Sequence, residues 1–139
     1  MKKLGQINLF TKRVTTKAPA PIERQVHILL ADTLRWSISP GWVWFHCPNG
    51  ELRNDATGAL LKRMGVLPGV SDFILIGPPH GRVFVLELKR KGRKPNNDQE
   101  LFMAAVTMTG GAAAWADNSK DAIEILKGWG ALTTRLQFD

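Results

Sequence analysis

GVSDFILIGPPHGRVFVLELKRKGRK, residues 69–94, contains two apolar runs joined by a short turn, and it decides the fold of this 139-residue chain. The runs at 70–76 and 82–89 have the β-branched and aromatic content of strands. The intervening GPPHG, residues 77–81, predicts a tight connection between them. The stretch therefore predicts an antiparallel hairpin within a β-sheet.

Charged residues lie at the ends of these two strands. Side chains of a strand alternate between its faces, so Glu87 and Lys89 share one face while Leu86 faces the opposite one. Asp72 begins the first strand. In a strictly symmetric hairpin we expect Asp72 opposite Leu86, whereas a one-residue bulge or a bend at Ser71 would bring it beside Glu87. The sequence leaves both registers open.

Two carboxylates and an ammonium group at one end of a sheet have a chemical use. Mg²⁺ prefers hard oxygen ligands, and a bound divalent ion polarises a phosphodiester and lowers the pKa of its water. A nearby lysine positions that water or stabilises the developing negative charge. The alternative is an ordinary salt bridge at a strand end, with Asp72 as a turn residue.

The remaining segments alternate helical and extended patterns. Helices are predicted over 21–36, 56–65, 96–110 and 119–130, and further strands over 42–47 and 112–116. The first helix is indicated by the helical spacing of Ile22, Val26, Leu29, Leu30 and Thr33. The later helices are predicted to begin at the N-caps Asn96 and Ser119. The fold class is therefore α/β, with a small mixed β-sheet flanked by helices.

The overall charge favours a polyanionic partner. The net charge is +7 and the isoelectric point about 10.0, but much of the excess lies in residues 1–21, which we expect to be a flexible basic tail. A folded domain is expected over 22–130 and a C-terminal tail over 131–139. A single cysteine excludes an internal disulfide, and no apolar run is long enough for a membrane span or a signal peptide. We therefore expect a cytoplasmic protein.

The order of these features carries a resemblance. The sequence resembles the PD-(D/E)xK nuclease superfamily over roughly residues 22–127. The features that carry the resemblance are, in order, Gly-x-x-Asp, a strand, a turn, a strand with Glu-x-Lys, a basic loop and a helix that opens with glutamine. The sequence looks most like the virus-type replication-repair (VRR-NUC) branch, related to Holliday-junction resolvases. The resemblance implies a restriction-endonuclease-like core of α-β-β-β-α-β-α order. It also implies a homodimeric, Mg²⁺-dependent endonuclease for branched or structured DNA in replication, repair or recombination, in a bacterium or a phage-infected cell, with Mn²⁺ able to substitute.

The resemblance assigns roles to individual residues. Asp72 and Glu87 match the metal-binding carboxylates, Lys89 the active-site lysine, Gln99 a catalytic glutamine, and Glu23 an additional metal ligand on the first helix. Glu23 has an alternative role as a first-turn acid that interacts with the helix dipole. Gln99 has an alternative role in a capping box. The family often has proline where this chain has serine, directly before the aspartate, and this departure removes no ligand.

Basic residues near this site are candidates for DNA-phosphate contacts. The alternative is a solvated loop. The candidates are Arg90, Lys91, Arg93 and Lys94, with Lys62 and Arg63 as a possible extension.

The three histidines carry weaker signals. His46 either reaches the site or the scissile phosphate, or it is a partly exposed structural residue. We expect His27 and His80 at the surface.

QINLF, residues 6–10, resembles the peptide by which bacterial replication proteins bind the β sliding clamp. Gln6, Ile7, Leu9 and Phe10 would make the contacts, presented by a tether that becomes ordered on binding. The alternative is that these side chains form an edge strand or fold back onto the domain.

Two other functions stay open from the sequence. The chain could be a non-catalytic DNA-binding module tethered to the replication machinery, or a nuclease that cuts RNA with the same chemistry.

Overall fold

The computed structural model describes residues 21–48 and 55–133. Nearly all of the predicted N-terminal tail, with the peptide at residues 6–10, and most of the predicted C-terminal tail lie outside the described residues. The elements in chain order are α2 (Pro21–Ser37), β1 (Val43–His46), α3 (Asp55–Arg63), β2 (Phe73–Gly77), β3 (Arg82–Leu88), α4 (Asn97–Met108), β4 (Ala112–Ala116) and α5 (Ser119–Gly128).

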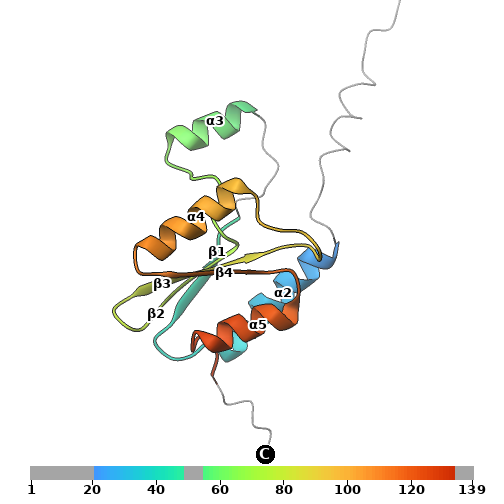
Figure 1. Ribbon diagram of the computed structural model, residues 1–139, viewed down its shortest axis with the longest axis vertical. Helices are drawn as coiled ribbons and strands as arrows, with labels where there is room; N and C mark the ends of the chain where they lie inside the picture. The colour runs from blue at the N-terminus through green and yellow to red at the C-terminus, as the bar shows by residue number, and fades with distance from the viewer. Residues whose placement is uncertain (1–20, 49–54, 134–139) are drawn as a thin grey trace, which may run out of the picture.

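The four strands form one mixed sheet in the order β1-β2-β3-β4. The pairs β1–β2 and β2–β3 are antiparallel, whereas β3 and β4 are parallel and connected through α4. Helices α2 and α5 cover one face of the sheet and α4 covers the other, while α3 stands apart from these layers (Figure 1). The predicted α/β class and element order are confirmed.

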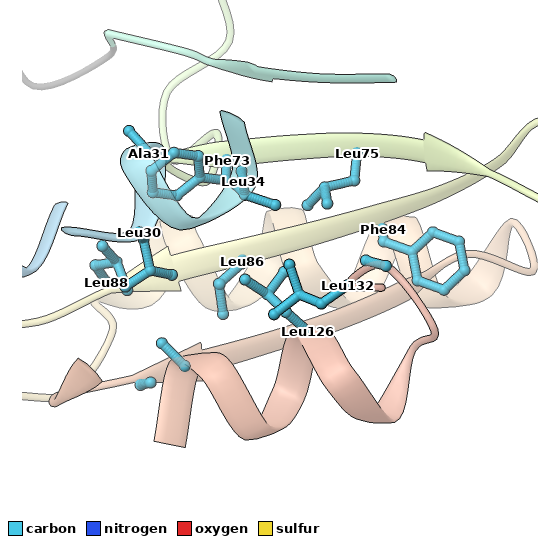
Figure 2. Packing of buried hydrophobic residues seen from close by; sticks show 13 residues of the cluster. Leu30, Ala31, Leu34, Phe73, Leu75, Phe84, Leu86, Leu88, Leu126 and Leu132 are labelled. Atoms are coloured by element: carbon cyan, nitrogen blue, oxygen red, sulfur yellow. The ribbon is translucent and has the colours of Figure 1, made fainter. Parts of the chain in front are cut away.

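The main core lies between the sheet and the helices α2 and α5 (Figure 2). Alternate residues of β3 point into it, as expected for a strand with one face toward this layer. On α2 the buried residues include Leu30 and Leu34, whereas Leu29, which belongs to the same pattern of helical spacing, is 46% exposed. The labelled core residues are Leu30, Ala31, Leu34, Phe73, Leu75, Phe84, Leu86, Leu88, Leu126 and Leu132.

The amino end of α4 is fixed by the predicted capping box. The Gln99 backbone N–H donates to Asn96 Oδ1 at 2.9 Å, and the Asn96 backbone N–H donates to Gln99 Oε1 at 2.8 Å. For α5 the predicted cap is wrong by one residue. Asn118, not Ser119, has the extended backbone of a cap, and its Oδ1 accepts from the Asp121 N–H at 2.8 Å.

The folded body continues beyond residue 130. Ala131 and Leu132 are buried, and the Thr133 N–H donates to the Ser37 carbonyl at 2.7 Å. A backbone bridge pairs Leu132 with Ile38. These contacts fasten the chain after α5 to the end of α2. Over residues 21–48 and 55–133, no helix combines the length and apolar character needed to cross a membrane.

Candidate active site

The hairpin register places the two carboxylates side by side. Phe73 pairs with Leu86 and Gly77 with Arg82, so the same ladder continued by one residue aligns Asp72 with Glu87. The connection between Gly77 and Arg82 has four residues, and the symmetric register therefore already brings the acids together. Our expectation that a symmetric hairpin would set Asp72 opposite Leu86 is wrong, because it assumed a three-residue loop.

Asp72 is fixed by both neighbouring strands. Its Oδ2 accepts from the Leu88 N–H at 2.7 Å, and its carbonyl accepts from the Cys47 N–H at 2.9 Å and from His46 Nδ1 at 2.7 Å. Burial raises the pKa of this carboxyl, and the Leu88 hydrogen bond and the nearby His46 and Lys89 oppose that rise. Asp72 is thus rigidly placed in an environment that disfavours an uncompensated negative charge.

Glu87 is the most deeply buried charged residue of the site, at 3% exposure. Its Oε1 accepts from Gln99 Nε2 at 2.8 Å and lies 3.3 Å from Lys89 Nζ. Its Oε2 is buried and finds no hydrogen-bond partner among the described residues. Burial and the neighbouring Asp72 raise the pKa of Glu87 to about 8, against the opposing effect of Lys89. A buried carboxylate with an unpartnered oxygen, next to the partly buried carboxylate of Asp72, is an arrangement that a cation would stabilise.

Glu23 reaches the same end of the sheet from the first turn of α2. It is half-buried, and its pKa is raised first by burial and then by the charge of Asp72. Lys89 and Arg90 oppose this rise. These interactions show that Glu23 lies within electrostatic reach of the predicted site. Glu23 also lies in the first turn of a helix, where the helix dipole favours a negative charge.

Gln99 completes the predicted capping box and also contacts Glu87. Its backbone N–H and its Oε1 complete the capping box with Asn96, while its Nε2 donates to Glu87. Because the cap fixes the amide orientation, the NH₂ group must face the carboxylate. The start of α4 thereby holds Glu87 in one orientation.

The predicted basic loop follows directly after β3 and is exposed. The carboxylate Oδ2 of Asp117, at the end of β4, accepts from the Gly92 N–H of this loop at 3.0 Å. That hydrogen bond, with a second from Asn118, lowers the pKa of Asp117. Asp117 thus anchors the loop, a role that was not predicted from the sequence. The exposed loop cations are Arg90, Lys91, Arg93 and Lys94.

The other predicted DNA-contact residues lie elsewhere. Lys62 and Arg63 are exposed in the last turn of α3, which stands apart from the layered body in Figure 1. No hydrogen bond or ion pair joins them to the described site residues. The site cluster therefore consists of the sheet end, the start of α2, the basic loop and the start of α4.

His27 is not the surface residue that we predicted. Its ring is half-buried, with its centroid 4.5 Å from that of Phe73 and 4.3 Å from that of His46. Burial, and secondarily His46, lowers the pKa of His27 to about 4. One ligand atom from each of His27, His46 and Asp72 lies within 4.8 Å of the others. The sequence contained one signal for this position of His27, namely its four-residue spacing from Glu23, which places both side chains on one helix face. His80 is exposed in the β2–β3 turn, as predicted.

The donor set fits a hard divalent cation. Carboxylate oxygens are the ligands that Mg²⁺ takes in proteins, and the free Oε2 of Glu87 supplies one that no protein donor occupies. Burial raises the pKa values of both Asp72 and Glu87, and the charge of Asp72 raises that of Glu87 further, and a bound cation would offset both effects.

No protein-family model and no curated protein matches this sequence. Among solved structures, the chain is similar to a VRR_NUC domain protein with a TM-score of 0.57, over 76% of this chain and 84% of that chain. The two sequences are 21% identical, so the likeness concerns the fold. The chain has a VRR-NUC-like fold, as the sequence resemblance predicted.

Proposed function

We propose that this chain, with its VRR-NUC-like fold, is a metal-dependent endonuclease that hydrolyses phosphodiester bonds in branched or otherwise structured DNA. One observation carries the proposal. Asp72, Glu87 and Lys89 meet Gln99 at one end of the sheet, and the buried Glu87 Oε2 has no hydrogen-bond partner among the described residues. A salt bridge that served stability alone would not require a second, partly buried acid beside Glu87.

Asp72 and Glu87, with Glu23 as a third ligand, would hold Mg²⁺, and Mn²⁺ would substitute for it. When bound, such an ion polarises a phosphodiester and lowers the pKa of a coordinated water. The raised pKa values of all three carboxyls support this assignment, since a cation removes the penalty that burial and mutual repulsion impose.

Lys89 supplies positive charge next to these ligands. Its ammonium group lies 3.3 Å from Glu87 Oε1 and is largely buried, at 17% side-chain exposure. A partly desolvated ammonium group stabilises the negative charge that develops on a phosphate during in-line attack. Gln99 acts through Glu87 as a positioning residue, because its amide keeps one carboxylate oxygen engaged.

The basic loop after β3 would contact the phosphates on either side of the cleaved bond. Arg90 is close enough to affect the pKa of Glu23, so the loop begins within reach of the acids. Such contacts position a nucleic acid without reading its sequence. A nuclease that cuts both strands of a junction symmetrically needs two sites, and we therefore propose that the chain acts as a homodimer.

A cleavage assay with five labelled substrates tests the proposal: a four-way junction, a flap, linear duplex, single-stranded DNA and single-stranded RNA. Each is incubated with Mg²⁺ or Mn²⁺ and with the chelated control. The wild type is compared with Lys89→Ala, which removes the ammonium group and leaves the carboxylates. Lys127→Ala is the matched control, since Lys127 is an exposed residue near the end of α5, paired with Glu124 at 3.7 Å.

Metal-dependent cutting of a structured DNA that is lost in Lys89→Ala and kept in Lys127→Ala would support the proposal. Cutting of RNA alone would instead identify an RNA nuclease. Binding of DNA without any metal-dependent cutting would favour the non-catalytic DNA-binding module.

A further inference from the structure

We propose that His27 and His46, together with the Asp72 carboxylate, bind a transition-metal ion of the Zn²⁺ or Co²⁺ type beside the carboxylate pair. The inference goes beyond the proposed nuclease activity, because it requires metal binding and no cleavage. Imidazole nitrogen suits Zn²⁺, Co²⁺ and Ni²⁺, whereas Mg²⁺ prefers oxygen. The two neighbouring donor sets would therefore select different classes of ion.

The three donor atoms are already nearly close enough to share one ion. They lie within 4.8 Å of one another. Two donors at the usual Zn–N distance lie at most about 4.2 Å apart, and about 3.4 Å apart in a tetrahedron. A pair separated by 4.8 Å would have to close by roughly 0.6 to 1.4 Å, and a closer pair by less, which is within the reach of small side-chain rotations.

The hydrogen bond of His46 prepares its other nitrogen as a ligand. Nδ1 lies 2.7 Å from the Asp72 carbonyl oxygen. A carbonyl oxygen only accepts, so Nδ1 must carry the hydrogen and the neutral ring has its lone pair on Nε2. Metal-binding histidines usually donate their second ring N–H to a carboxylate or a backbone carbonyl, and this contact orients the ring. His46 is also exposed, so an ion can reach it from solvent.

His27 is held by packing. Its ring stacks on Phe73 at 4.5 Å and meets the His46 ring edge-on at 4.3 Å. Phe73 is fully buried in β2, directly after Asp72 and paired with His46 in the sheet. The same strand segment thus supports all three donors, and α2 brings His27 to them one turn after Glu23.

Titration of untagged, metal-free protein with Co²⁺ tests the inference, because the visible absorption of Co²⁺ reports its ligands independently of catalysis. His27→Phe keeps a ring on Phe73 and removes the nitrogens. His46→Asn keeps an N–H donor for the Asp72 carbonyl and removes Nε2. His80→Asn is the matched control, since His80 is exposed in the β2–β3 turn. Mg²⁺ affinity is measured for the same proteins by calorimetry.

We expect one Co²⁺ to bind to the wild type and to His80→Asn with the same spectrum. His27→Phe and His46→Asn should each weaken Co²⁺ binding by more than the roughly hundredfold that loss of an outer hydrogen-bond partner can cost. Their Mg²⁺ affinity should change by less than threefold. Glu87→Gln should show the reverse pattern, with Mg²⁺ binding weakened and the Co²⁺ spectrum kept.

Unchanged Co²⁺ affinity and spectrum in His46→Asn would overturn the inference, even if His27→Phe failed to fold. Absence of Co²⁺ binding to the wild type would also overturn it, and so would a parallel loss of Mg²⁺ and Co²⁺ affinity in both histidine variants. Each of these results leaves the nuclease proposal intact, because Mg²⁺-dependent cleavage is measured separately.

Discussion

Replacing Glu87 by glutamine should change how the stability of the metal-free protein depends on pH. The substitution keeps the shape of the side chain and an oxygen that can accept from Gln99, but it removes the buried negative charge. Glu87 is 3% exposed, so solvent does little to screen this charge.

The size of the effect follows from the raised pKa. The Glu87 carboxyl titrates at about 8 in the folded protein, against 4.5 ordinarily. Between these values the folded state holds a proton that the unfolded chain has released, so the free energy of unfolding falls as pH rises. The decrease is up to about 1.4 kcal/mol per pH unit, or roughly 2–3 kcal/mol between pH 5 and pH 7. Relative to the wild type, Glu87→Gln should therefore gain about that much stability over this interval.

Urea unfolding in the presence of a chelator, followed by fluorescence of the five tryptophans, measures this difference. Both proteins are unfolded at pH 5, 6, 7 and 8. A second series at pH 7 contains saturating Mg²⁺, which at one hundred times its dissociation constant would stabilise the wild type by about 2.7 kcal/mol. The variant should gain much less from the ion.

Parallel stability curves for the two proteins from pH 5 to pH 8 would refute this reasoning. They would mean that Glu87 is ionised in the folded protein without a metal, with Lys89 and its hydrogen-bond donors compensating the charge.

Three other perturbations give separate tests. Gly69→Ala should destabilise the protein by about 1–3 kcal/mol or more in urea unfolding. The φ of +84° at this position disfavours a side chain, and the new Cβ would overlap the α4 backbone at residues 98 and 99. A variant as stable as the wild type would contradict this prediction. The double variant Arg93→Ala/Lys94→Ala should lower the slope of log affinity against log salt by up to about 2 in DNA binding, and an unchanged slope would exclude phosphate contacts by these side chains. Deletion of Gln6–Phe10 should leave cleavage intact and abolish binding to a bacterial β sliding clamp in a pull-down. Clamp binding that survives the deletion would show that residues 6–10 are not the clamp-binding peptide.

The strand pairing at the centre of the fold was predictable because its signals are local. Strand-like apolar runs and the Gly-Pro-Pro-His-Gly turn define the hairpin, and Asn96 with Gln99 defines the start of α4. The register stayed open because the turn type, and so the loop length, determines which residues face each other. Asn118 was missed as a cap because adjacent Asn and Ser both have the chemistry for that position.

The contacts of His27 could not be read from the sequence. Its partners come from β1 and β2, and only the packing of α2 onto the sheet brings the rings together. The contact of Asp117 with Gly92 could not be read from the sequence either, because it depends on the parallel pairing of β3 with β4. Local patterns thus predicted the residues on the hairpin and the α4 cap, whereas contacts between distant elements required the structure.

The central claim is that the buried Glu87 serves metal-dependent hydrolysis and not stability. Mg²⁺-dependent cleavage of a labelled four-way junction by folded Glu87→Gln, beside the wild type, tests it most directly. The account predicts that the wild type cuts the junction and that the variant, although at least as stable as the wild type without metal at pH 7, cuts it at least about a hundredfold more slowly. That decrease corresponds to a loss of about 2.7 kcal/mol in transition-state stabilisation. Cleavage by the variant at the wild-type rate would contradict it.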